Sequence, residues 1–137
     1  GTPMDLFNMP VNEFVAGFLG SPKMNFFDGQ LSQIAADGLR AGFTGEGIEA
    51  SDVRLVSGDK TIGSKVRIGI RPQHLKIDPK GHVAGKVTLV ERLGTETIVE
   101  LLSMQGTAFR FASGDVSDLN VGEEVRFSFD ASLAHLF

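Results

Sequence analysis

The spacing of hydrophobic residues changes close to residue 22. Before it, apolar side chains recur at i, i+1, i+4 and i+5, a spacing that places on one helix face Phe14, Val15, Phe18 and Leu19. After it, apolar and polar residues mostly alternate, as they do in strands that bury one face. We therefore predict a helical extension and linker over residues 1–22, followed by a β-barrel over residues 23–137.

The extension is predicted to hold two short helices. Thr2 and Pro3 suit the start of the first helix, which ends at Pro10. Asn12 can cap the second helix, and Gly20 suits its end. Isolated helices this short are marginal in water, so we expect their apolar face to pack on the barrel or on a neighbouring copy.

The strand pattern is most regular in residues 66–70 and 125–129. Residues 85–93 and 96–103 are predicted to form a hairpin that turns at Gly94. Many short strands with turns at regular spacing are typical of closed sheets, which have no free edges. The predicted fold class is therefore mainly β, a small OB-like β-barrel, with a single helical turn expected in residues 131–137.

The composition narrows the range of possible functions. The chain has 137 residues, is 42% hydrophobic and contains no cysteine, so it suits one folded domain without disulfides or zinc–thiolate sites. Its formal net charge of −4 argues against a nucleic-acid surface. The eleven phenylalanines, with no Tyr or Trp, indicate a buried core. The start at Gly1 carries neither an initiator Met nor a signal sequence, so we expect a piece of a longer protein.

No sequence motif predicts a catalytic or metal site. The loop at residues 81–88 is one residue too short between its glycines for a phosphate loop, and it has Val where a magnesium ligand is needed. The three histidines are scattered, without metal-ligand spacing. Glu91 and Glu96 flank the predicted hairpin turn, where they form an acid pair, a solvated tip or a polar surface for another protein.

Several segments resemble the ATPase subunits of maltose-type sugar ABC importers. Residues 1–7, Pro10 and residues 14–26 resemble the junction between the nucleotide-binding and regulatory domains of that family. The segment Gly69-Ile-Arg-Pro-Gln-His-Leu75 is similar to the family's GIRPEHL element, with Gln73 in place of Glu. The resemblance continues in residues 90–96 and 135–137, so it extends over nearly the whole chain in the expected order.

The resemblance implies a C-terminal regulatory domain of the transport-associated OB (TOBE) type. It implies a parent protein that binds ATP and Mg²⁺ and hydrolyses ATP to power uptake of a sugar or related solute. The motifs for that chemistry precede Gly1 in the family, so the chain itself is expected to be no enzyme and to hold no cofactor or metal. The implied location is cytoplasmic, peripheral to the inner face of the cell membrane.

The resemblance also implies the partners and the contact residues. The partners are a second copy of the ATPase subunit, the membrane permease subunits and a regulatory protein, with no nucleic acid. The expected contact residues are Gly69, Arg71, Pro72, His74, Glu91, Gly94, Glu96, His135 and Phe137. Arg71 can bind a carboxylate through two hydrogen bonds, and Phe137 suits an anchor. Packing within the barrel is the alternative interpretation for all of them.

Two other functions stay open at this point. One is a sensing barrel for a small ligand, a sugar or an oxyanion. The other is an OB-type binder of single-stranded nucleic acid, which the net charge and the lack of Tyr and Trp stacking platforms argue against.

Overall fold

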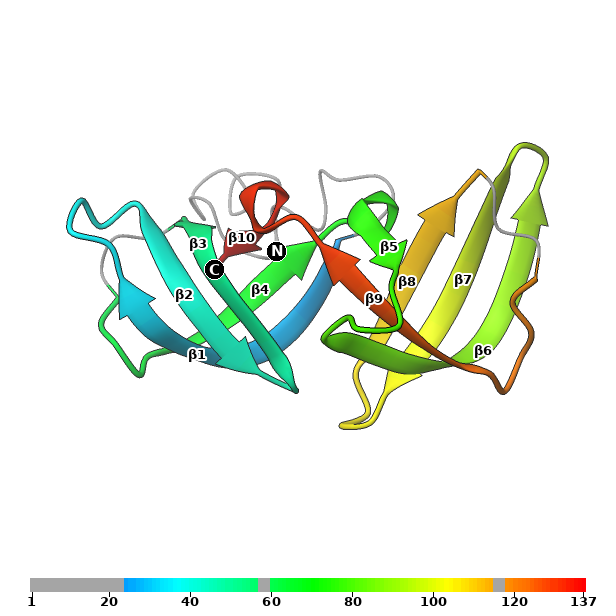
Figure 1. The fold of residues 1–137 in the computed structure, drawn as a ribbon, viewed down its shortest axis with the longest axis horizontal. Helices are drawn as coiled ribbons and strands as arrows, with labels where there is room; N and C mark the ends of the chain where they lie inside the picture. The colour runs from blue at the N-terminus through cyan, green and yellow to red at the C-terminus, as the bar shows by residue number, and fades with distance from the viewer. Residues whose placement is uncertain (1–23, 57–59, 115–117) are drawn as a thin grey trace, which may run out of the picture.

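The computed structural model describes residues 24–56, 60–114 and 118–137, and these form two five-stranded sheets side by side (Figure 1). The first sheet is a closed barrel with the order β1-β2-β3-β10-β4. Its strands are β1 (Asn25–Ile34), β2 (Arg40–Gly45), β3 (Ile48–Leu55), β4 (Lys65–Ile70) and β10 (His135–Leu136). Strand β10 closes the barrel by pairing parallel to β3 and antiparallel to β4.

The second sheet has the order β5-β9-β6-β7-β8 and two edge strands, β5 and β8. Its strands are β5 (Leu75–Ile77), β6 (Val83–Leu93), β7 (Glu96–Ser103), β8 (Ala108–Ser113) and β9 (Glu124–Phe129). The 3₁₀ turn η1 (Pro72–His74) leads from the barrel into this sheet, and η2 (Ala131–Leu133) leads back.

The structure corrects the expectation of one small barrel. The mainly β class and a closed barrel are confirmed, but half of the strands form a separate sheet. The predicted hairpin is confirmed, since Leu93 pairs with Glu96 and Gly94 has φ +62 in the turn. The C-terminal helical turn is limited to η2, and the strand β10 that follows it was not predicted.

The two-helix extension over residues 1–22 lies outside the residues that the structure describes, and so does the face made by Phe14, Val15, Phe18 and Leu19. No helix in the described part of the chain is long and apolar enough to cross a membrane.

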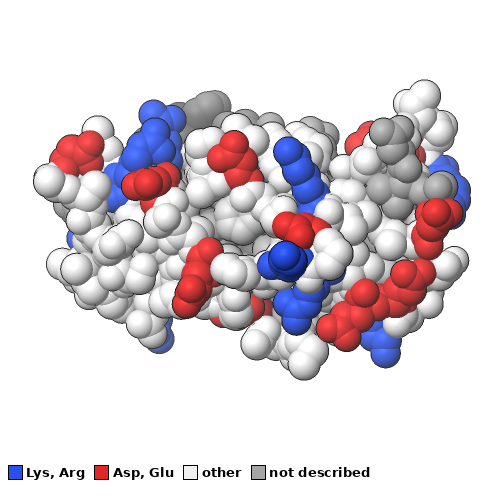
Figure 2. All heavy atoms as spheres, viewed as in Figure 1, with Lys and Arg blue, Asp and Glu red and all other residues white. Residues whose placement is uncertain are grey.

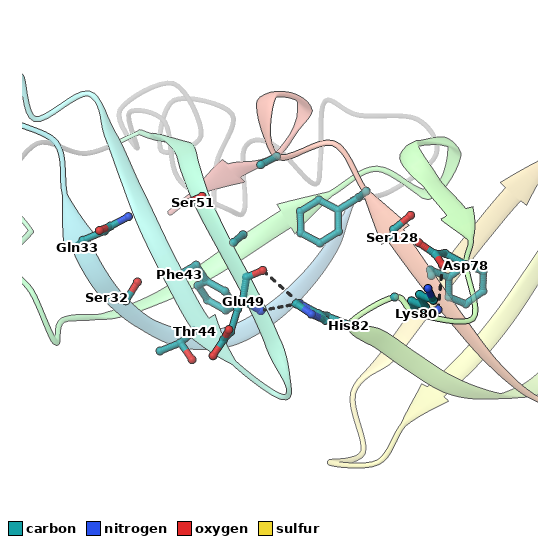
Figure 3. Close-up of a pocket in the computed structure, with 15 residues that line it drawn as sticks. Ser32, Gln33, Phe43, Thr44, Glu49, Ser51, Asp78, Lys80, His82 and Ser128 are labelled. Atoms are coloured by element: carbon teal, nitrogen blue, oxygen red, sulfur yellow. Dashed lines mark hydrogen bonds between the residues drawn. The ribbon is translucent and has the colours of Figure 1, made fainter.

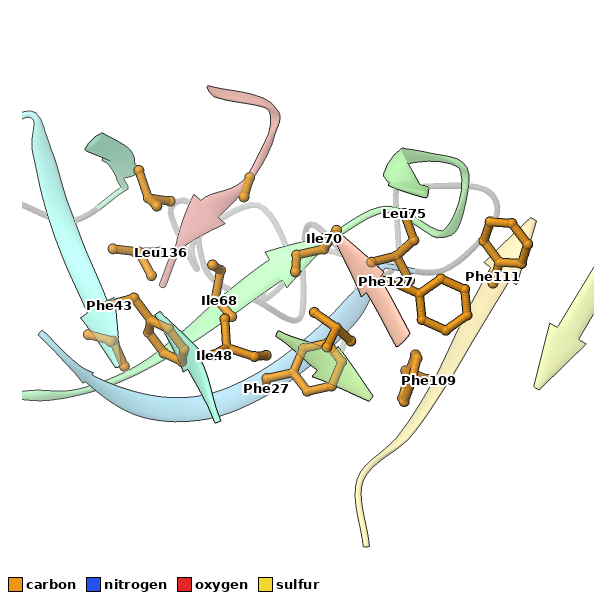
Figure 4. Close-up of a cluster of buried hydrophobic side chains, with 14 of the residues drawn as sticks. Phe27, Phe43, Ile48, Ile68, Ile70, Leu75, Phe109, Phe111, Phe127 and Leu136 are labelled. Carbon is orange, nitrogen blue, oxygen red and sulfur yellow. The ribbon is translucent and has the colours of Figure 1, made fainter. Parts of the chain in front are cut away.

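One hydrophobic core joins the two sheets (Figure 4). Phe27 of β1 packs on Phe109 of β8, with ring centroids 5.3 Å apart. Phe127 of β9 lies 6.0 Å from Phe109 and 4.9 Å from Phe111. Because Phe has no polar group to satisfy, these rings can meet in the middle of the molecule without a hydrogen-bond cost. The sequence prediction that the phenylalanines build a core is confirmed for these residues.

Two polar side chains also connect the sheets. Asn25 of β1 is 5% exposed, and its amide exchanges two hydrogen bonds of 2.8 Å with the backbone N–H and C=O of Arg110 in β8. Glu46, in the β2–β3 turn, accepts hydrogen bonds from Ser103 Oγ at 3.2 Å and Thr107 Oγ1 at 2.8 Å. Its other carboxylate oxygen accepts one from the backbone N–H of Asp28 at 3.1 Å. The barrel and the second sheet are therefore held together by specific contacts at two edges.

Candidate functional site

The outer face of the barrel carries a group of cationic and imidazole side chains, Arg54, Arg71, His74 and His135, which we call the Arg–His cluster. In the sheet register His135 of β10 lies between Arg54 of β3 and Gly69 of β4. The next residues, Leu55, Leu136 and Ile70, are buried in the barrel, so Arg54 and His135 point outward. Arg71 and His74 come from η1 and the residue before it.

Within the described residues, no ion pair neutralises the arginines of the Arg–His cluster. Burial lowers the pKa of His135 below its ordinary value of 6.5, and the positive charges of Arg54, Arg71 and His74 lower it further. In the described part of the chain, the Nδ1 atoms of His74 and His135 are buried without a hydrogen-bond partner. Among the same residues, ion pairs are formed between Arg67 and Asp28 and between Arg110 and Glu100, but none involves Arg54 or Arg71.

An aromatic group lies beside the Arg–His cluster on the same face. A Cβ atom on Gly69 would contact Met24 Sδ and lie 2.9 Å from Phe137 Cε2. The absence of a side chain at Gly69 therefore lets Phe137 and Phe26 cover β4, with their rings 5.7 Å apart in an edge-to-face arrangement. Gly69 is buried and serves barrel packing, whereas Phe26 and Phe137 remain partly exposed.

The outer face of the second sheet carries carboxylates instead. Glu91 and Glu96 lie at the end of the β6–β7 hairpin, and Glu100 follows on β7. Together with Leu93, Ile98, Pro72 and Arg110 they line a cavity of about 320 Å³. We call the surface formed by Glu91, Glu96, Glu100 and Leu93 the acidic face. Leu93 is 56% exposed at the hairpin end of this face, where it pairs with Glu96, and Arg110 pairs with Glu100 at 3.1 Å.

The structure brings together two of the elements predicted to make contacts. Pro72 of η1 lines the same cavity as Glu91 and Glu96 of the hairpin, although the three residues lie in separate parts of the sequence. Arg71 and His74 lie on either side of Pro72 in the chain, so η1 borders both the Arg–His cluster and the acidic face. Gly94 lies at the exposed tip of the hairpin.

A groove of about 700 Å³ lies between the two sheets and was not predicted from the sequence (Figure 3). Hydroxyl and amide groups and one carboxylate line its barrel side, and its other side is lined by a carboxylate, an ammonium group, an imidazole and a hydroxyl. These residues are Ser32, Gln33, Thr44, Ser51 and Glu49 from the barrel, with Asp78, Lys80, His82 and Ser128 facing them. His82 Nδ1 lies 3.4 Å from both the backbone N–H and the C=O of Glu49. No signal in the sequence marks the groove, because each segment contributes only a few ordinary polar residues.

No metal centre is formed in the described residues, where no three His, Asp or Glu groups lie close enough to share an ion. Figure 2 shows acidic and basic side chains interspersed on one face of the molecule, with acidic ones grouped at the lower right. That face has no continuous basic track of the kind that follows a nucleic-acid backbone.

The fold defines the class of protein, an OB-like barrel that shares its core with a second sheet. A family model described as "TOBE domain" matches residues 68–137, and one described as "MalK OB fold domain" matches residues 20–75. The chain therefore belongs to the TOBE domain family, as the resemblance predicted.

The relatives it matches are subunits of importers. The chain is 32% identical to the maltose/maltodextrin import ATP-binding protein MalK of Vibrio vulnificus strain YJ016, over all of this chain and 37% of that protein. It is 38% identical to the sn-glycerol-3-phosphate import ATP-binding protein UgpC of Bordetella pertussis, over 72% of this chain and 26% of that protein. The chain thus spans little more than a third of the length of the first relative and about a quarter of the second.

A solved structure shares the fold. The cytoplasmic molybdate-binding protein ModG superposes with a TM-score of 0.61 at 17% identity, over 82% of this chain and 94% of that one.

Proposed function

We propose that this chain is the C-terminal regulatory domain of the ATP-binding subunit of an ABC importer for a sugar or related solute. The observation that supports this most directly is the match of the entire chain to import ATP-binding proteins. Relatives named for maltose/maltodextrin and for sn-glycerol-3-phosphate both match it, so the domain has a role common to importers of different solutes. ATP and Mg²⁺ belong to the nucleotide-binding part of the parent protein, and this domain performs no catalysis of its own.

The proposed role is contact with a second copy of the subunit while the nucleotide-binding domains open and close. The parent then lies at the cytoplasmic face of the membrane with its permease subunits, and a regulatory protein acts through the same domain. A partner that prefers one arrangement of the dimer shifts transport by at most its difference in affinity between arrangements. The Arg–His cluster, the acidic face and the partly exposed ring of Phe137 are the surfaces offered for such contacts.

Two measurements on the isolated chain test this proposal. Calorimetric titration with ATP and Mg²⁺ should give no binding heat, and micromolar affinity for ATP would contradict the assignment to a non-catalytic domain. Sedimentation velocity from micromolar to millimolar chain should show a concentration-dependent shift toward a dimer. A strict monomer over that range would contradict the contact role.

The groove between the sheets favours a second candidate function, the sensing of a small ligand. Its hydroxyl, amide and charged groups can donate and accept hydrogen bonds around a sugar or an oxyanion, and the structural relative ModG is described as molybdate-binding. The midpoint temperature of thermal unfolding, measured with maltose, sn-glycerol-3-phosphate or molybdate, should then rise by a few degrees with one of these ligands. The variant His82→Ala should abolish the rise, and an unchanged transition with all three ligands would remove this candidate.

A further inference from the structure

We infer that the groove between the two sheets binds a neutral polyhydroxy compound, a sugar or a polyol, and not an oxyanion. This inference rests on the second candidate function above, because it names the class of ligand that the groove takes.

The barrel side of the groove is built on two neighbouring β-bulges. In β1, Ser32 is the extra residue where the register with β2 shifts, next to Gly42. On the other side of β2, Ser51 and Asp52 of β3 lie opposite Gly42 alone, and Asp52 has φ +56. That conformation costs free energy in a residue other than glycine, and such strain is concentrated at functional sites. A Cβ atom on Gly42 would lie 2.5 Å from Ser32 Oγ. Because bulges re-aim side chains, these two account for the hydroxyls of Ser32 and Ser51 lining the groove.

The opposite side of the groove is a hydrogen-bonded turn between β5 and β6. Asp78 Oδ1 accepts a hydrogen bond of 2.9 Å from the backbone N–H of Lys80, and the C=O of Asp78 accepts one of 2.9 Å from Gly81. Gly81 is buried, and a Cβ atom on it would collide with the backbone of Phe127 in β9. The turn therefore lies directly on the second sheet. Both walls are held by backbone contacts before a ligand binds, which lowers the cost of ordering the site.

The groove offers both donors and acceptors beside an apolar surface. The hydroxyls of Ser51 and Ser128 and the ammonium group of Lys80 form no hydrogen bond or ion pair with another described residue. A ligand hydroxyl can donate and accept at once, so it can match all of these groups. The partly exposed ring of Phe129 lines the same groove, where the C–H side of a sugar ring can pack on it. An apolar surface with a few polar groups is typical of small-molecule sites.

The charges of the lining argue against an oxyanion. The described residues that line the groove hold two carboxylates, those of Glu49 and Asp78, and one ammonium group, that of Lys80. Figure 3 shows Asp78 and Lys80 on the side of the second sheet, across from Glu49 on the barrel. An anion in the groove is repelled by two like charges and attracted by one opposite charge. A neutral polyol instead donates its hydroxyl protons to both carboxylates, and hydrogen bonds to charged acceptors are the stronger ones.

Nuclear magnetic resonance titration of the isotope-labelled chain with maltose tests the inference. Chemical-shift changes should concentrate in residues 32–33, 49–51 and 78–82. The dissociation constant should be in the millimolar range, because an open groove makes few contacts with its ligand. The anions sn-glycerol-3-phosphate and molybdate, at the same concentrations, should leave these signals unchanged.

Neutralising the two carboxylates should affect the two ligand classes in opposite directions. Glu49→Gln/Asp78→Asn keeps the shape of both side chains and should weaken maltose binding by about fivefold or more, because uncharged acceptors form weaker hydrogen bonds. In an oxyanion site the same variant would strengthen the binding of sn-glycerol-3-phosphate, because the repulsion is removed.

Filling the groove provides a second test. Ser51→Phe places a ring in the groove and should abolish maltose binding. Thr95→Phe makes a similar change at the exposed tip of the β6–β7 hairpin and should leave maltose binding unchanged. Circular dichroism establishes that each variant is folded.

The outcomes separate the inference from the functions beneath it. Binding of sn-glycerol-3-phosphate or molybdate at these residues, without binding of maltose, overturns the inference and leaves a sensing groove. Shifts caused by spermidine in place of maltose assign the groove to an organic cation and also overturn it. Maltose binding that Ser51→Phe leaves intact places the ligand elsewhere and contradicts the inference. If none of these compounds shifts the signals, the sensing function fails together with the inference, while the assignment to a C-terminal regulatory domain is unaffected.

Discussion

The barrel and the second sheet differ in how their edge strands are paired. The barrel closes on itself, because β10 fills the space between β3 and β4. The second sheet stays open, and its edge strand β8 is approached instead by the side chain of Asn25, which bonds to the backbone of Arg110 as a neighbouring strand would. Closure pairs the strands of the barrel with one another all round, whereas the second sheet depends on the barrel for part of its edge.

The two regions also differ in what they offer to a partner. The outer face of the barrel carries the Arg–His cluster and aromatic rings, and the outer face of the sheet carries carboxylates together with the exposed Leu93. The shared phenylalanine core fixes these two surfaces relative to each other. The difference shows how one small chain of net charge −4 can still present a locally cationic surface.

The largest expected effect comes from the shared core. Phe127→Ala removes a fully buried ring that contacts Phe109 and Phe111, and it should lower the free energy of unfolding by about 3–5 kcal/mol. Urea denaturation followed by circular dichroism measures this change. Because the core spans both sheets, one cooperative transition is expected, with Phe26→Ala on the barrel's outer face as a milder control. Two separate transitions would mean that the barrel and the sheet fold independently.

A smaller loss of stability is expected where the edge strand β8 is hydrogen-bonded to the barrel. Asn25→Ala leaves the N–H and C=O of Arg110 without their partner and should cost about 1–3 kcal/mol of unfolding free energy. Asn25→Asp keeps an acceptor for the N–H but sets a carboxylate against the carbonyl oxygen, so it should not restore stability. Faster amide hydrogen exchange in β8 than in β3 would locate the loss, and equal exchange in both strands would contradict the dependence of the sheet on the barrel.

Glu46 tests the other edge between the regions. Glu46→Ala removes the acceptor for Ser103 and Thr107 and should cost about 1–2 kcal/mol by the same denaturation measurement. Glu46 has φ +50, a left-handed conformation that glycine adopts without strain. Glu46→Gly should therefore be more stable than Glu46→Ala by a few tenths of a kcal/mol to about 1 kcal/mol. An alanine variant as stable as the wild type would show that these hydrogen bonds do not hold the sheets together.

The smallest effect is a pH dependence that belongs to the barrel face alone. His135 has a pKa below 6.5 in the folded chain, so between the two values the unfolded chain binds more protons. The free energy of unfolding should therefore fall as the pH drops through 6.5 toward the lower folded value. Denaturation at a series of pH values should show a shallower slope for His135→Gln, and an identical slope would assign the effect to another group.

Contacts between residues close in sequence were predicted, and contacts between distant residues were not. The β6–β7 hairpin and the position of Gly94 were predicted because a hairpin is made by residues close in sequence. The contact between Asn25 and Arg110 was not, because 85 positions separate them and either residue alone looks ordinary. Among the expected contact residues, Pro72, Glu91 and Glu96 do meet at one cavity, whereas Gly69 is buried under Met24 and Phe137.

The sequence by itself determined the mainly β class, the core-forming role of the phenylalanines and the family to which the chain belongs. Alternation of apolar and polar residues reports which face of a strand is buried, so these features need no knowledge of neighbours. Only the tertiary structure decided that the strands divide into two sheets, that β10 closes the barrel and that four cationic or imidazole side chains gather without a counter-ion in the described residues. Strand order depends on which distant segments pair, and alternation is the same for every choice of partner.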